Sequence, residues 1–294
     1  MELISIVIPT YRRSETLSRS IDSVLRQTYK KIEVLVVDDN EKGSPESLYV
    51  FNLLNSITDK RVRLVTQPKH INGAEARNAG VRSSQGEYIA FLDDDDEWDP
   101  TKLEKQIRVL KENTEIDGVS CLYHELENGI VFHSCPPYSS ENLHLKIFER
   151  RVAVFTSTIL LRKHALLESG LFDVTLKRHQ DLQLLLDFTK NHQMYVINEY
   201  LVKLHSDSTI NRPSYERLVN IKKDFFKACN AHLELYSKSV QKTILGVHYF
   251  ELAFAALKEK KYGKAFKHII NVGLNIKAYQ LLYQRMKDRK FISK

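Results

Sequence analysis

Four consecutive aspartates constrain this chain more than any other feature of its 294 residues. Asp93 to Asp96 directly follow an apolar run, Tyr88 to Leu92, that has the length of a short buried strand. Carboxylates this close raise one another's pKa, and a hard divalent cation is a common compensating charge. Such a run is also typical of a solvated acidic turn that caps the next helix. The strand before it favours a site, because open α/β sheets bind ligands at the carboxyl ends of their strands.

The first hundred residues alternate between strand and helix patterns. Apolar runs of strand length, separated by segments with helical spacing, occur at Ile4–Pro9, Ile32–Val37, Val62–Val65 and Glu87–Leu92. This alternation predicts βαβ units and a mostly parallel sheet flanked by helices. Polar loops after the first, second and fourth strands would then meet at one edge, and they carry Thr10–Arg12, Asp38–Asn40 and the four aspartates. We therefore predict one site there.

The remainder of the chain divides into a mixed part and a helical part. Further strands are predicted at Ile116–Tyr123, Ile130–His133, Thr156–Leu161 and Tyr195–Leu204. From about Tyr215 onward apolar residues recur only at helical spacing, and Tyr249–Gly263 with Lys264–Gly273 resembles a helical hairpin. We predict an α/β domain over residues 1–212 and an all-helical extension over residues 213–294.

The charge is unevenly distributed along the chain. The formal net charge is +7, yet the segment from Lys258 to the end has eleven Lys and Arg against two acids, a net charge of +9. Four roles suit this basic tail: a face for an anionic membrane, a dock for a polyanionic acceptor, a surface for a second copy of the chain, or a solvated helix face.

The sequence also indicates where in the cell the protein is expected. Three cysteines, an odd number without metal-ligand spacing, indicate reduced thiols in a cytosolic protein. The N-terminus lacks a signal-peptide pattern, and no window has the apolar length of a membrane span. We expect a cytoplasmic protein, with peripheral attachment to the inner face of the cell membrane if the basic tail binds lipid.

Four motifs together resemble glycosyltransferase family 2, whose nucleotide-sugar-binding fold is called GT-A. They are SIVIPTY at Ser5–Tyr11, VVDDN at Val36–Asn40, ARNAG at Ala76–Gly80 and GEYIAFLDDDDEW at Gly86–Trp98. The resemblance covers roughly the first 210 residues and implies a Rossmann-like fold. It also implies sugar transfer with inversion at the anomeric carbon. The processive relatives carry a Q-x-x-R-W motif and membrane helices, which are absent from this sequence, so we expect one sugar per encounter.

The resemblance implies roles for residues that bind the nucleotide-sugar donor. Pro9 and Tyr11 would flank the nucleobase, and Asp38 and Asp39 would accept hydrogen bonds from the base or ribose. Arg77 would place a fixed charge near the diphosphate.

Within the acidic run, the family's D-x-D pattern falls on Asp93 and Asp95. Asp93 would contact the ribose and assist the metal, Asp95 would hold Mn²⁺ or Mg²⁺ at the diphosphate, and Asp94 would take either role. Asp96 is expected to belong to the scaffold. His205 matches a histidine that reaches the metal or diphosphate in relatives. The polar stretch Ser206–Thr209 resembles a segment that closes over the donor.

The acceptor end of the site is also implied by the resemblance. Asp181 is the predicted catalytic base that takes the proton of the acceptor hydroxyl. Gln180 stands where relatives commonly have Glu, and we predict that it contacts the acceptor. Trp98 is a further predicted acceptor contact, or a buried anchor. An alternative for Asp181 is a helix cap.

The functional prediction is therefore a metal-dependent glycosyltransferase of bacterial surface polysaccharide synthesis. It would move a hexosyl or N-acetylhexosaminyl group from a nucleotide-sugar, which we expect to be a UDP-sugar, to a glycan, lipid-linked glycan or polymer. Two alternatives are a nucleotidyltransferase acting on sugar phosphates and a non-catalytic nucleic-acid-binding protein using the basic tail. The first would need a glycine-rich phosphate loop that TYRRSET lacks, and the second leaves the aspartates unexplained.

Overall fold

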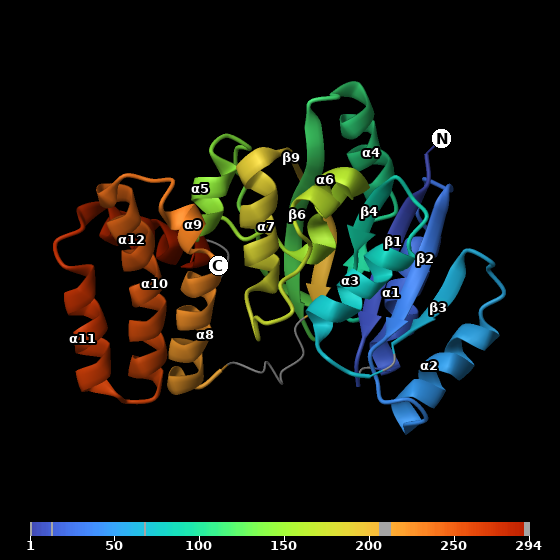
Figure 1. Ribbon diagram of the computed structural model, residues 1–294, viewed down its shortest axis with the longest axis horizontal. Helices are drawn as coiled ribbons and strands as arrows, with labels where there is room; N and C mark the ends of the chain where they lie inside the picture. Colours follow the sequence, from blue (N-terminus) through green and yellow to red (C-terminus); the bar gives the residue numbers. More distant parts are fainter. Residues whose placement is uncertain (1, 13, 68, 206–212, 291–294) are drawn as a thin grey trace.

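The centre of the molecule is one mixed sheet flanked by helices (Figure 1). The computed structural model describes residues 2–290 except 13, 68 and 206–212. Within these ranges the strand order is β3-β2-β1-β4-β8-β6-β9-β5, and β7 pairs with β6. The strands are β1 (Ile4–Thr10), β2 (Ile32–Asp38), β3 (Val62–Thr66), β4 (Tyr88–Phe91), β5 (Glu97–Trp98), β6 (Ile116–Glu127), β7 (Ile130–Ser134), β8 (Leu160–Arg162) and β9 (Gln193–His205).

The four N-terminal strands are parallel, as the alternation of patterns predicts. Their register aligns Thr10 with Asp38 and Asp38 with Thr66, so three strands end at the same level. The amide of Leu92 continues the pairing of β4 by donating to the Val7 carbonyl, which brings the four aspartates to that edge. The other half is mixed, because β8 runs antiparallel to both neighbours whereas β6 and β9 are parallel.

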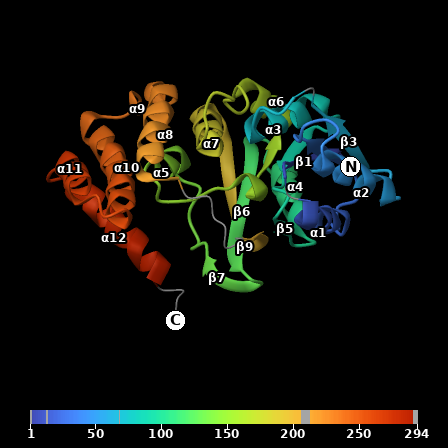
Figure 2. The same ribbon diagram turned by 90° about the horizontal axis from the view of Figure 1, so that it is seen from below.

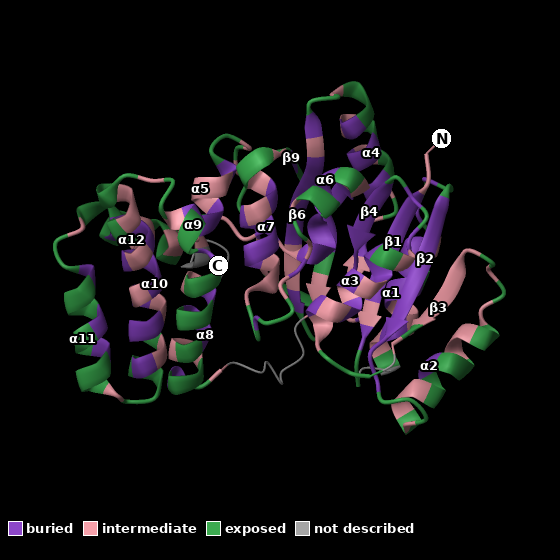
Figure 3. Ribbon diagram, in the orientation of Figure 1, coloured by how far each residue is buried: buried purple, intermediate pink, exposed green. Residues whose placement is uncertain are grey.

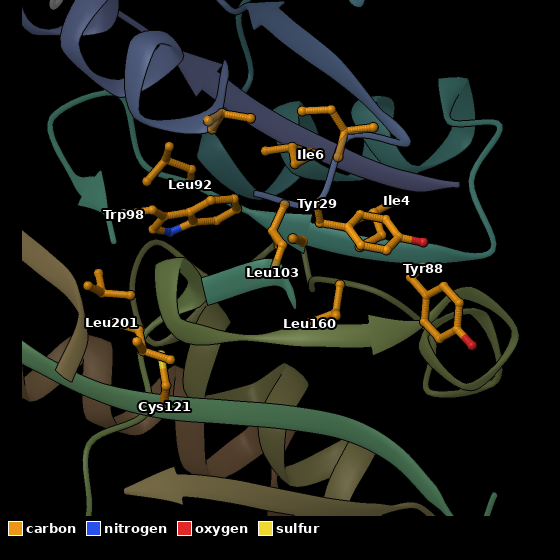
Figure 4. Packing of buried hydrophobic residues seen from close by; sticks show 14 of the residues in the cluster. Ile4, Ile6, Tyr29, Tyr88, Leu92, Trp98, Leu103, Cys121, Leu160 and Leu201 are labelled. Carbon is orange, nitrogen blue, oxygen red and sulfur yellow. The ribbon is translucent and has the colours of Figure 1, made fainter. Parts of the chain in front are cut away.

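Helices cover both faces of the sheet because successive strand residues point to opposite faces. Ile4, Ile6 and Ile8 of β1 face one cluster, and Val7 faces the other. The first cluster, part of which Figure 4 shows, is covered by α1 (Ser14–Leu25), α2 (Pro45–Ser56) and α4 (Lys102–Glu112). The second is covered by α3 (Gly73–Ser83), α5 (Leu143–Phe148), α6 (Lys163–Glu168) and α7 (Gln180–Asn191). Figure 3 shows the buried strands between them.

The C-terminal part is helical, as predicted, and packs against the sheet domain through α5 and α7. Its elements are α8 (Tyr215–Ala228), α9 (Asn230–Leu233), α10 (Lys238–Lys258), α11 (Tyr262–Val272) and α12 (Ile276–Lys290). Figure 2 shows them grouped at the end of the molecule away from β3. Phe225, Cys229 and Ile244 belong to the second core cluster, so the two parts share one hydrophobic core. No helix in the described ranges is long and apolar enough to cross a membrane.

Two predicted elements were wrong in their bounds. The strand expected at Thr156–Leu161 begins as a 3-10 turn, η1 (Thr156–Thr158), because the Thr158 hydroxyl donates to the Phe155 carbonyl and the Ser157 hydroxyl to Asp96. The helical hairpin turns at residues 259–261, earlier than predicted. Lys260 has a φ of 58°, so a left-handed residue ends α10 without the glycine that usually marks such a stop.

The glycine of the ARNAG motif sets the distance between α3 and β1. A Cβ at Gly80 would lie 2.3 Å from Val7 Cγ1. An interior helical Gly→Ala change ordinarily stabilises by up to about 1 kcal/mol, whereas overpacking costs about 1–3 kcal/mol. We therefore expect Gly80→Ala to lower the free energy of unfolding in urea titrations. Gly263→Ala on α11 is the matched control, because its Cβ would meet no atom within 4 Å. Equal stability of the two variants would contradict this packing.

Candidate active site

A pocket of about 310 Å³ lies at the carboxyl edge of the parallel strands. It is walled by the end of β1, the loops after β2, β3 and β4, and the start of α3. Its lining residues are Pro9, Thr10, Tyr11, Asp39, His70, Gly73, Ala76, Arg77, Asp93, Asp94 and Asp95. Seven of the residues predicted from the sequence therefore meet in one place, although their individual roles remain predictions. The volume is within the range of small-molecule sites.

Arg77 is the central positive charge of the pocket. It projects from the second turn of α3, whose N-terminus is capped by the Asn72 side chain accepting from the Glu75 amide. The guanidinium forms an ion pair with Asp93, and its side chain is only 14% exposed. Burial lowers the pKa of Arg77, but the charges of Asp93, Asp181 and Asp94 outweigh burial and raise it. Arg77 therefore stays charged and compensates carboxylates from two separate parts of the chain.

The four aspartates have different environments. Asp93 and Asp95 line the pocket, and so does Asp94, although its residue is only 6% exposed. The Thr10 hydroxyl donates to Asp94 Oδ2 over 2.8 Å and so ties the ends of β1 and β4 together.

Asp96 belongs to the scaffold, as predicted. It accepts hydrogen bonds from the Ser157 hydroxyl and the His205 amide. Burial, followed by the charge of Asp93, raises the pKa of Asp96 well above its ordinary value.

The side chains of the adjacent acids Asp38 and Asp39 have different surroundings, and only that of Asp39 lines the pocket. Asp38 accepts from the Asn40 amide and side chain through Oδ1 and from the Ser47 hydroxyl through Oδ2, and it does not line the pocket. The Asp38 carboxylate therefore holds the loop to α2, and its contact with the nucleotide stays a prediction. Asp39 does line the pocket, and burial raises its pKa.

His70 is a pocket residue that the sequence reasoning missed. Its ring stacks on Tyr11 with centroids 4.0 Å apart and planes 11° from parallel. Its Nδ1 lies 2.9 Å from Asp39 Oδ2, and Gln67 donates to Asp39 Oδ1. Its position in the sequence could have indicated this role. His70 follows the third parallel strand, so it lies at the same sheet edge as the loops after the first, second and fourth strands.

Asp181 lies in the first turn of α7, which begins at Gln180 after His179 in a left-handed conformation with φ of 64°. The helix cap is thus residue 179, so the alternative of Asp181 as the cap is wrong. Asp181 does not line the pocket itself, but its charge acts on Arg77. The Gln180 side chain donates to the Leu176 carbonyl, which ties it to the loop before α7.

Trp98 is the buried anchor and not a surface contact. The residue is 2% exposed, its Nε1 donates to the Ser157 carbonyl, and Lys102 Nζ lies 3.8 Å from the ring centroid. The predicted acceptor contact is therefore wrong for this geometry, because the ring is enclosed in the first core cluster (Figure 4).

His205 ends β9 and does not line the pocket, but its amide donates to Asp96, the residue after Asp95 of the pocket wall. Its Nε2 is buried, makes no hydrogen bond within the described residues, and lies 3.6 Å from Glu97 Oε2. Burial, together with the charge of Arg19, lowers the pKa of His205, which favours the neutral form that can ligate a metal. The segment Ser206–Thr209 lies outside the described residues.

The pocket has carboxylates of the kind that a divalent cation uses together with oxygen ligands from outside the protein. No group of three or more His, Cys, Asp or Glu in the described part of the chain is arranged to hold a metal alone. Mg²⁺ and similar ions commonly use one or two carboxylates and complete their shell with phosphate oxygens and water. Asp95 at the pocket wall is a hard oxygen donor of that kind.

Solved structures that superpose on this chain include proteins of the GT-A fold. TarS of S. aureus in complex with UDP-GlcNAc superposes with a TM-score of 0.64 at 18% identity, over 100% of this chain and 90% of that one. The mannosyltransferase PcManGT from Pyrobaculum calidifontis, in complex with GDP-Man and Mn²⁺, gives 0.62 at 14% identity, over 99% and 82%. The fold of this chain is therefore the GT-A fold that these proteins share.

The chain belongs to glycosyltransferase family 2. Residues 5–167 match the family model described as Glycosyl transferase family 2. An uncharacterized glycosyltransferase of Rickettsia prowazekii is 29% identical over 99% of this chain and 86% of its own length. The Escherichia coli protein WfgD, a UDP-Glc:alpha-D-GlcNAc-diphosphoundecaprenol beta-1,3-glucosyltransferase, is 38% identical over 42% of this chain and 46% of its own length. Family membership sets aside the nucleotidyltransferase and nucleic-acid-binding alternatives.

Proposed function

We propose that this protein transfers a hexosyl group, with inversion, from a UDP-sugar to a hydroxyl of a lipid-diphosphate-linked glycan in bacterial surface polysaccharide synthesis. The observation that carries the proposal is the convergence of Arg77, Asp93, Asp95 and the Tyr11–His70 stack on one pocket at the strand ends. The E. coli relative, which acts on such an acceptor, supports the choice of acceptor, and the structures holding UDP-GlcNAc or GDP-Man support a nucleotide-sugar donor.

The donor half of the pocket suits a nucleoside diphosphate. The stacked rings of Tyr11 and His70 offer an aromatic platform beside which a base can lie. Asp39 is the acceptor for base or ribose hydrogens, and Arg77 places its charge where the diphosphate would lie. Proximity of these groups orients the anomeric carbon before reaction.

A divalent cation, Mn²⁺ or Mg²⁺, is proposed at Asp95, with Asp93 and His205 as further candidate ligands. When bound, it would supply positive charge to the diphosphate leaving group without proton transfer. The Mn²⁺ complex of PcManGT supports this choice. On the other side of the sugar, Asp181 accepts the proton of the attacking acceptor hydroxyl. The charges of Asp93, Asp181 and Asp94 raise the pKa of Arg77, so a fixed positive charge faces these carboxylates.

A thermal-shift titration tests the donor and metal assignments together. Ligands that bind only the folded state stabilise it by about 2.7 kcal/mol at one hundred times Kd. We expect UDP with Mn²⁺ to raise the melting temperature by several degrees, about 2–4 °C per kcal/mol for a chain of this size. Asp95→Asn is expected to remove the Mn²⁺-dependent part of the shift and to keep the smaller shift from UDP alone.

The control for this titration is Asp224→Asn, which removes an exposed carboxylate on α8 far from the pocket. A UDP shift that is absent with and without Mn²⁺ would overturn the proposed donor. A shift that needs Mn²⁺ but is unchanged in Asp95→Asn would move the metal to other ligands.

A further inference from the structure

A second cavity, of about 930 Å³, lies between the C-terminal helices and the loop that leads into α7. None of the residues that line this cavity lines the donor pocket. Its walls come from the end of α5, the start of α8, one face of α10 and one face of α12, helices that Figures 1 and 2 both show together at this end of the molecule.

One wall of this cavity is apolar although it is open to solvent. Val247, Phe250 and Phe254 recur along α10 at helical spacing, and Leu282 and Met286 face them from α12. Phe254 is 42% exposed and Met286 is 45% exposed. Large side chains left exposed around a concave surface are typical of a binding site for an apolar group.

The rim of the same cavity has more cations than anions: Arg150, Arg151, Arg178, Lys258 and Arg285 against Glu149, Glu251 and Glu259. Each of the three carboxylates is paired with a basic side chain. Arg150 and Arg285 contact Glu251, which also pairs with the buried Lys222. These charges hold α5, α8, α10 and α12 together and are internally compensated. Arg178 and Lys258, by contrast, line the cavity and form no ion pair within the described residues. Two uncompensated cations beside an apolar wall match an anionic headgroup joined to a hydrocarbon chain.

Arg178 lies in the loop before α7, close in sequence to the proposed catalytic base. Arg178 precedes Asp181 by three residues, and three residues span at most about 10 Å. The Cα atoms of Arg178 and Asp181 therefore lie within about 10 Å of each other.

We propose that this cavity binds the prenyl diphosphate of the acceptor, with the hydrocarbon chain against Phe250, Phe254 and Met286 and the diphosphate at Arg178 and Lys258. The sugar attached to the diphosphate would then extend toward Asp181. This inference rests on the proposed function and assigns the acceptor lipid a site. A polyanionic polymer would use the cations but would leave the apolar wall without a role, so the lipid is the better match.

Binding of farnesyl diphosphate, measured by calorimetry with saturating UDP present, tests the cavity. Saturating UDP keeps the probe out of the donor pocket, and inorganic pyrophosphate and polyphosphate serve as probes that lack the hydrocarbon chain. We expect farnesyl diphosphate to bind tighter than either. The double variant R178A/K258A should weaken it by about tenfold or more, because hydrogen bonds to charged groups contribute about 1.5–3 kcal/mol. Phe254→Ala should weaken farnesyl diphosphate only, and Lys264→Ala, an exposed change on α11 outside the cavity, should change nothing.

The outcomes separate the two proposals. Normal UDP binding with equal farnesyl diphosphate affinity in all variants would overturn the cavity assignment and leave the proposed function standing. Polyphosphate binding as tight as farnesyl diphosphate binding would overturn the lipid in favour of a polymer. Loss of UDP binding in the unaltered protein would instead contradict the proposed function. Because Phe254 and the two cations lie at the surface, unchanged melting temperatures are expected for these variants.

Discussion

Asp181→Asn is expected to lower the rate of sugar transfer by about two to four orders of magnitude while leaving UDP binding unchanged. General base catalysis contributes roughly that much, and an amide cannot accept the acceptor's proton. The side chain is nearly isosteric, and Asp181 is not the cap of α7, so the helix start should remain intact. The measurement is the transfer rate at saturating donor, with UDP affinity determined on the same preparation.

Asp224→Asn removes the same charge from an exposed site on α8 and is the matched control for this loss. Retention of full transfer activity by Asp181→Asn would show that another group takes the proton. A parallel loss of UDP affinity would instead place Asp181 among the donor-binding residues.

Arg77→Met is expected to cost about 1–3 kcal/mol of stability in addition to donor binding. Removing one partner of a partly buried, hydrogen-bonded ion pair leaves the other group unsatisfied, and this penalty is typically of that size. Here the Arg77 side chain is 14% exposed and that of Asp93 is 37% exposed, and the carboxylates of Asp93, Asp181 and Asp94 all act on Arg77. Urea unfolding at neutral pH measures the loss. It should shrink as the pH falls toward ordinary carboxyl pKa values, because protonated carboxyl groups no longer repel one another.

Arg82→Met is the matched control on the same helix. Arg82 pairs with Glu75 at the surface, where its side chain is 53% exposed, and exposed pairs contribute about 0–1 kcal/mol. If both variants lost the same stability, Arg77 would not be the charge that holds the pocket together.

The fold could be predicted from the sequence because its signal is local. The β-branched runs and the helical spacing between them define the parallel half, and strand ends define the edge where Tyr11, Asp39 and Asp93 meet. The antiparallel insertion of β8 was not predictable in this way, since pairing direction depends on contacts between residues far apart in sequence.

The site could be predicted only in part. Asp38 and Trp98 match family motifs, yet Asp38 is held by Asn40 and Ser47 and Trp98 is enclosed by the core. His70 has no motif and still stacks on Tyr11. A motif indicates which residues come near an edge, whereas the direction of each side chain depends on the hydrogen bonds and packing around it.

The acidic run illustrates the division between sequence and structure. The sequence alone determined that four carboxylates follow an apolar strand pattern, and it predicted that they need compensation and lie at the edge of the sheet where a ligand would bind. Only the tertiary structure decided how they differ, because it brings Arg77 to Asp93, Thr10 to Asp94, and Ser157 to Asp96 from distant parts of the chain. The tertiary structure also shows that the basic tail helps to form a cavity, because five separate segments of the chain pack together around the space beside Arg178. Local sequence patterns determine the helices and strands. Which side chains compensate a buried charge depends instead on which helices and strands pack against one another.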